Sequence, residues 1–168
     1  MSRHALFASL AWAALTAWAF LSSGCGDSEE VAPSASIVEV APDSLDPARD
    51  DADDLTIRVE YADGDADLGG GTASIHDCRS DGLVAQLAIP PIASEEAVAK
   101  GVPIEGILDL IVNDVGWVEP AGAAPPACAE QGAPAPQAES AVFCVVLTDI
   151  AGHAGAGDCT SPVAIAAP

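Results

Sequence analysis

The sequence predicts an all-β protein: an antiparallel sandwich of about seven short strands, held together by two disulfides. Apolar and polar residues alternate in short runs, most regularly over 55–61, where every second residue is Leu, Ile, Val or Tyr. Gly, Pro and Asp interrupt these runs at short intervals, as turns between strands would. Four cysteines follow residue 70, and an even number is typical of a disulfide framework. The length of 168 residues fits one domain.

Between residues 36 and 71 we expect two strands, each followed by an acidic segment. A short strand is expected at 36–40, followed by a solvated acidic loop over 41–54. After the alternating strand at 55–61, residues 62–71 are too rich in Gly and Asp for a helix and predict a turn. The remaining strands are expected at 72–78, 83–89, 104–112, about 141–149 and 158–166.

Two segments interrupt this series of strands. Residues 94–100 predict one short helix, because Ser94 is a favoured N-cap and Gly101 a favoured terminator. Residues 113–140 are rich in Pro, Ala and Gly and predict a long loop. A loop of that length inside a compact domain is typically functional or mobile.

The cysteines favour one of three disulfide arrangements. A turn centred between Ala151 and Gly152 would place Cys144 and Cys159 opposite each other on neighbouring strands. That pairing leaves Cys78 for Cys128 and ties the long loop to the body. The competing arrangement joins Cys78 to Cys144. No short paired spacing such as C-x-x-C is present, so structural zinc is not expected.

The N-terminus has the composition of a targeting segment. Residues 1–4 are basic, 5–21 form an uncharged apolar run, and Leu-Ser-Ser-Gly-Cys follows at 21–25. This ending resembles the lipobox of bacterial lipoproteins, although Ser occupies the usual Leu place. The resemblance implies a signal peptide over 1–24 and acylation of Cys25. The alternative is an uncleaved anchor helix.

The lipoprotein resemblance also implies a location. Gly26 follows the lipobox Cys, where Asp would retain the protein in the inner membrane. The expected location is therefore the outer membrane of a Gram-negative bacterium, with the body facing either the periplasm or the outside. Residues 25–35 are expected to form an acidic flexible tether, and 36–168 the folded domain.

A second resemblance lies near the C-terminus. The segment VVLTDIAGHAG is similar to the last two strands of bacterial immunoglobulin-like domains, which are joined by an Asp-x-Ala-Gly-Asn turn. Asp149, Ala151 and Gly152 match this turn, and His153 stands in the Asn place. The resemblance implies an immunoglobulin-like β-sandwich.

The turn at 62–71 is the candidate metal site. Asp63, Asp65 and Asp67 alternate, and a looped backbone would direct their carboxylates toward one point. Oxygen ligands of this kind suit Ca²⁺. The EF-hand template does not fit, because Leu68 stands where that loop needs Gly and Ser74 where it needs Glu. The alternative is a solvated turn on an acidic protein.

Charge and residue inventory limit the function. The formal net charge of −21 excludes binding of nucleic acid by phosphate neutralisation. His76 and Asp77 are neighbours that point to opposite faces of a strand, His153 is expected to be exposed and without a role, and Trp117 is the one candidate platform for a sugar. The prediction is a non-enzymatic, lipid-anchored envelope protein that binds or supports another envelope protein or a polysaccharide. The alternative is a hydrolase using acids near 63–67 or in the loop 113–140.

Overall fold

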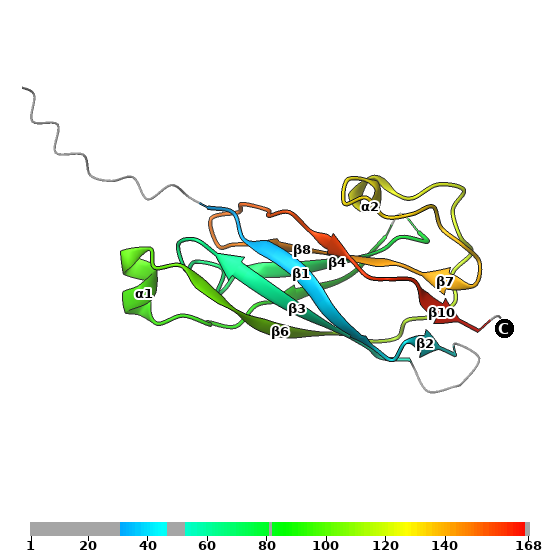
Figure 1. Ribbon diagram of the computed structural model, residues 1–168, viewed down its shortest axis with the longest axis horizontal. Helices are drawn as coiled ribbons and strands as arrows, with labels where there is room; N and C mark the ends of the chain where they lie inside the picture. The colour runs from blue at the N-terminus through cyan, green and yellow to red at the C-terminus, as the bar shows by residue number, and fades with distance from the viewer. Residues whose placement is uncertain (1–30, 47–52, 81, 167–168) are drawn as a thin grey trace, which may run out of the picture.

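The computed structural model describes residues 31–46, 53–80 and 82–166. Within them the chain forms three β-sheets and two short helices (Figure 1). The expected signal peptide and Cys25 lie outside the described residues. Neither described helix has the length and apolar character needed to cross a membrane.

The first sheet has the order β1-β3-β6 and is antiparallel throughout. Its strands are β1 (Ser34–Ala41), β3 (Leu55–Asp63) and β6 (Ile104–Val112). Strand β3 lies in the centre, paired with β1 on one edge and β6 on the other, and its alternating Leu, Ile, Val and Tyr side chains are buried on one face. The expected bounds of β6 are confirmed. Strand β1 starts two residues earlier than expected, within the segment assigned to the tether.

The second sheet has the order β5-β4-β8-β9 and is also antiparallel. Its strands are β4 (Thr72–Asp77), β5 (Leu83–Ala88), β8 (Phe143–Thr148) and β9 (Asp158–Cys159). It lies behind the first sheet in Figure 1. Buried side chains of β3 and β6 join those of β4 and β8 in one apolar cluster, with Phe143 as a fully buried aromatic residue. The core therefore lies between the two sheets.

A small third sheet was not expected. It pairs β2 (Ser44–Leu45) with β10 (Val163–Ile165) in parallel, and β10 with β7 (Ser140–Ala141) in antiparallel. The expected acidic loop 41–54 thus contributes a strand. The expected strand at 158–166 is divided into β9 and β10, and the expected strand at about 141–149 into β7 and β8. The end of the chain leaves the second sheet after β9 and pairs with β7 instead.

The two helices occupy opposite ends of the molecule (Figure 1). Helix α1 (Glu95–Lys100) confirms the expected helix: the Ser94 hydroxyl accepts a hydrogen bond from Ala97 N, and Gly101 ends the helix in the left-handed conformation. Helix α2 (Pro126–Ala129) lies inside the segment expected to be a loop. It carries Cys128 into the protein interior, so this segment is tied to the body.

Candidate metal centre

Asp63 carries a carboxylate into a core position. It is the last residue of β3, where Leu55, Ile57, Val59 and Tyr61 alternate inward, and the same period places Asp63 on the inner face. Only 2% of its surface is exposed. A buried ionised carboxylate is costly unless it is hydrogen-bonded or coordinated to a cation.

The turn that follows brings two more carboxylates to Asp63. Ala66 adopts a left-handed conformation with φ of 67°, which reverses the chain between Asp65 and Asp67. One carboxylate oxygen of each Asp lies within 4.8 Å of the other two. The buried Leu68 anchors the end of the turn, and its N–H donates to Asp63 Oδ2 at 2.9 Å. The expected convergence of the three acids is thus present.

The three carboxylates are incompletely satisfied by the protein. The Oδ1 atoms of Asp63, Asp65 and Asp67 are all buried, and none has a hydrogen-bond partner. Buried polar atoms in folded proteins nearly always have a partner. An ionised carboxylate only accepts, so three such oxygens cannot satisfy one another. The missing partner is a cation, a proton or a bound water.

The electrostatics of the turn agree with this requirement. Burial is the main cause that raises the pKa of Asp63 above its ordinary value. Burial also raises the pKa of Asp67 to about 6, with further contributions from the neighbouring carboxyl group of Asp65 and from the charge of Asp149. Each shift means that burying the negative charges, and to a lesser extent bringing them together, is unfavourable. A divalent cation would reverse this effect.

The loop after β8 packs against this turn. Ile150 N donates to the main-chain oxygen of Asp67 at 3.3 Å. The buried Asp149 accepts from His153 N at 2.8 Å, and its Oδ2 lies 3.2 Å from His153 Nδ1. His153, expected to be exposed and without a role, is half-buried, and its ring contacts the Asp149 carboxylate, whose charge contributes to the raised pKa of Asp67. Both residues belong to the turn motif seen in the sequence, but that motif does not indicate the proximity to Asp67.

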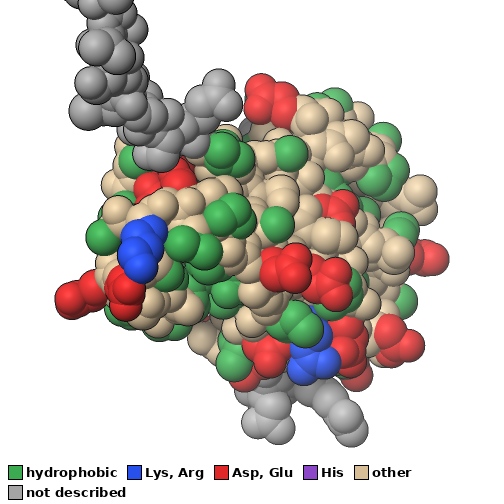
Figure 2. Space-filling view, turned by 60° about the vertical axis from the view of Figure 1, so that its left-hand side comes forward, with side chains coloured by type: hydrophobic (Ala, Val, Ile, Leu, Met, Phe, Trp, Pro, Cys, Tyr) green, Lys and Arg blue, Asp and Glu red, His purple; other side chains and the backbone are tan. Residues whose placement is uncertain are grey.

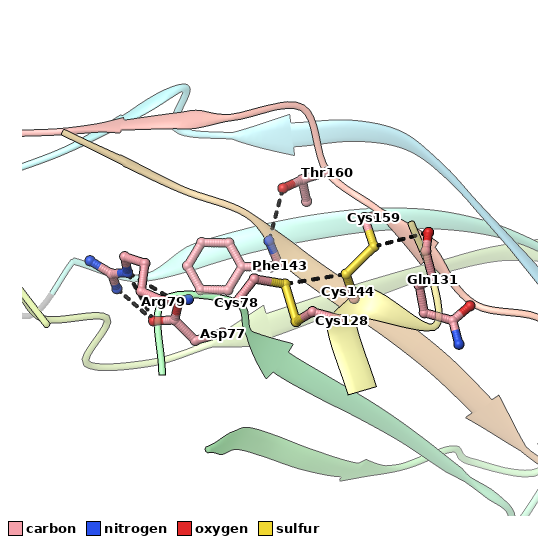
Figure 3. The surroundings of a disulfide bond; sticks show 9 residues. All are labelled: Asp77, Cys78, Arg79, Cys128, Gln131, Phe143, Cys144, Cys159 and Thr160. Atoms are coloured by element: carbon pink, nitrogen blue, oxygen red, sulfur yellow. Dashed lines mark hydrogen bonds and ion pairs between the residues drawn. A yellow bond between two sulfur atoms is a disulfide. The ribbon is translucent and has the colours of Figure 1, made fainter. Parts of the chain in front are cut away.

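The four cysteines form a second cluster, which is fully disulfide-bonded (Figure 3). The predicted pairs Cys78–Cys128 and Cys144–Cys159 are both present. Cys144 and Cys159 lie opposite each other in the β8–β9 register, as the turn-centre argument required. The competing pair Cys78–Cys144 is not formed, although the two sulfurs are 3.3 Å apart. Disulfide sulfurs are not thiolates, so this cluster offers no thiolate metal site.

A buried ion pair beside the disulfides was not anticipated. The Arg79 guanidinium donates to both oxygens of Asp77, with Nη2 at 2.6 Å from Oδ2 (Figure 3). Only 1% of Arg79 and 3% of Asp77 is exposed. Nη2 also donates to the Gly116 carbonyl, so Arg79 holds the start of the long segment 113–140. The role of this pair is structural.

No protein-family model, curated protein or solved structure matches this chain.

Proposed function

We propose that this chain is an exported, lipid-anchored protein of the cell envelope that binds Ca²⁺ at Asp63, Asp65 and Asp67 and serves as a binding or structural module. The observation that carries the metal assignment is the convergence of three buried carboxylate oxygens without partners. Ca²⁺ takes six to eight oxygen ligands, so water or another ligand completes the shell. The ligand of the module is an envelope protein or a polysaccharide.

The distribution of strands supports an immunoglobulin-like architecture. Counting the long strands and β9 in chain order, the first, second and fifth share one sheet, while the third, sixth and seventh share the other. Immunoglobulin domains divide their strands in this way. Here the fourth strand, β5, pairs with the third. The two disulfides also favour an oxidising compartment, as an exported protein requires.

The anchor is tested at Cys25. The Cys25→Ser variant is expected to lose metabolic lipid labelling and to accumulate as the unprocessed precursor, because the thiol is the acylated group. Labelling and membrane fractionation measure this. Retention of an unlabelled, full-length wild-type protein in the membrane would instead make residues 5–21 an uncleaved anchor.

The metal site is tested by thermal unfolding with and without Ca²⁺ at high monovalent salt. A ligand that binds only the folded state stabilises it by RT ln(1 + [L]/Kd), about 1.4 kcal/mol when Ca²⁺ is tenfold above Kd. The melting temperature of the wild type is expected to rise in millimolar Ca²⁺, whereas that of Asp65→Asn is not. High salt suppresses diffuse attraction of Ca²⁺ to the acidic surface.

Asp43→Asn is the matched control, because Asp43 is an exposed acid outside the turn. This variant is expected to respond to Ca²⁺ as the wild type does. Equal rises in wild type and Asp65→Asn, or no rise in either, would exclude the site.

No observation favours the hydrolase alternative. Glycosidases place two carboxylates on either side of the scissile bond, about 5 Å or more apart. Here one oxygen of each Asp lies within 4.8 Å of the others in a single turn. This arrangement suits a shared cation better than an intervening substrate.

A further inference from the structure

The Asp turn lies at the end of the molecule where the chain enters from the N-terminus. Val31, the first described residue, packs directly on Gly64: a Cβ added to Gly64 would lie 2.6 Å from the Cβ of Val31. If Cys25 carries the lipid, as proposed above, at most about 20 Å of extended chain separates it from Val31. This end is therefore held close to the lipid headgroups, and the inference below rests on that anchor.

The same end exposes several aliphatic side chains. Helix α1, the turn after β3 and the loop after β8 all lie there in Figure 1, and Figure 2 shows apolar side chains grouped among acidic ones when this end is turned forward. Ile150 belongs to the loop after β8, Val102 and Pro103 join α1 to β6, and Val31 precedes β1. An open groove of about 610 Å³ is lined by Val31, Asp63, Gly64 and Pro103 among others. The exposed fractions are 46% for Val31, 39% for Val98, 43% for Val102 and 59% for Ile150. Exposed apolar side chains beside a lipid surface are suited to its interfacial layer.

Charge alone would keep this end away from anionic lipid. Glu95 and Glu96 lie on helix α1 at this end, Glu105 lines the groove together with Asp63, and like charges repel the phosphates. In the described part of the chain every Lys or Arg is already paired with a carboxylate: Arg58 with Glu39 and Asp109, Arg79 with Asp77, and Lys100 with Glu96. A cation must therefore supply the attraction.

We propose that this end docks on the anionic lipid surface in which Cys25 is anchored, with Ca²⁺ joining the Asp turn to lipid phosphate and Ile150, Val31 and Val102 entering the interface. Three Asp side chains leave part of the Ca²⁺ coordination shell open, and phosphate oxygens are suitable hard ligands for it. Docking fixes the orientation of the whole molecule: the end that carries α2 and β7 faces away from the membrane (Figure 1).

The test uses the lipidated protein in vesicles of phosphatidylethanolamine and phosphatidylglycerol that contain brominated phospholipid as a quencher. Trp117 is the one Trp after Cys25, so Trp117→Phe provides a silent background. In this background, Ile150→Trp reports on the proposed docking end. Ile111→Trp is the matched control. Ile111 is similarly exposed, but it lies on β6 seven residues beyond Ile104, the residue that pairs with Asp63.

The indole introduced by Ile150→Trp is expected to lose most of its fluorescence in millimolar Ca²⁺ and to regain it with a chelator or with Asp65→Asn. The indole introduced by Ile111→Trp is expected to stay unquenched. Equal quenching at both positions, or none at either, overturns the proposal. Equal Ca²⁺-dependent quenching on zwitterionic phosphatidylcholine vesicles overturns the bridge to anionic lipid.

The unfolding experiment above separates the two proposals. If Ca²⁺ stabilises the wild type but not Asp65→Asn while Ile150→Trp stays unquenched, docking is wrong and the metal site stands. If Ca²⁺ has no effect on stability, the metal site itself fails. If the indole of Ile150→Trp stays quenched after the chelator is added, the contact with lipid is apolar only, and the proposed Ca²⁺ bridge is wrong.

Discussion

Asp67 makes stability without Ca²⁺ depend on pH in an unusual direction. Its pKa is raised to about 6 in the folded protein, mainly by burial, from an ordinary value of 3.8. Between these values the folded state binds more protons than the unfolded state, so stability falls as pH rises from about 4 to about 6. Bound at the proposed site, Ca²⁺ would replace the proton and remove this loss of stability.

Urea unfolding at pH 5 and pH 7 measures the effect. In chelator the wild type is expected to be less stable at pH 7 than at pH 5, and Ca²⁺ is expected to stabilise it at pH 7 far more than at pH 5. Asp67→Asn should show a smaller pH difference in chelator. An Asp67→Asn variant with the full wild-type difference would contradict this assignment.

Arg79 provides a residue-level test of the interior. Arg79→Met leaves the Asp77 carboxylate buried without its cation and releases the Gly116 carbonyl. Breaking a buried pair on one side costs about 3–5 kcal/mol. The double variant of Arg79→Met with Asp77→Asn removes both charges and is expected to recover part of this loss in urea unfolding. Exposed Arg58→Met, the control, should cost under about 1 kcal/mol.

At the scale of elements, the two disulfides are expected to contribute unequally. The bridge Cys78–Cys128 spans 50 residues and Cys144–Cys159 spans 15. In the loop-entropy model these correspond to about 4 and about 3 kcal/mol. Replacing both cysteines of one pair by Ala avoids free thiols, and urea unfolding compares the two variants. A larger loss for the hairpin pair would show that local packing, not loop closure, dominates.

The long strands could be predicted from sequence because their signal is local. The alternation of β3 and the bounds of β6 follow from which residues face the core. The same alternation, extended by two residues, predicts that Asp63 points inward. The small sheet could not be predicted, because pairing of β10 with β2 and β7 depends on contacts across the whole chain. Helix α2, with four residues, is too short to give a periodic signal.

The candidate metal site could be predicted in part, because the spacing of its three Asp residues is also a local signal. Alternate Asp residues in a turn indicate convergence, but their missing partners can be counted only in three dimensions. Asp149 and His153 lie four residues apart in one turn, but the effect of Asp149 on Asp67 joins two turns that are far apart in sequence. The Asp77–Arg79 pair lies two residues apart, yet its burial depends on the distant segment at Gly116.

The whole molecule carries a formal charge of −21, which opposes compaction. Monovalent salt is therefore expected to raise the melting temperature by a few degrees in chelator, because the screening length falls from about 30 Å at 0.01 M to about 10 Å at 0.1 M. Salt also weakens the exposed ion pairs, which lowers the melting temperature, but each of these pairs contributes little to stability. A melting temperature that falls with salt, measured by calorimetry, would show that ion pairs outweigh repulsion.

The 3.3 Å contact between Cys78 and Cys144 has a consequence for the order in which the chain matures. Closing the 15-residue loop to Cys159 is about ninefold more probable on entropic grounds than closing the 66-residue loop to Cys78. The β8–β9 hairpin is therefore expected to oxidise first, which would occupy Cys144 before Cys78 comes within reach of it. Once Cys144 is bonded to Cys159, the remaining cysteine available to Cys78 among the four is Cys128. The first disulfide would thus determine the second.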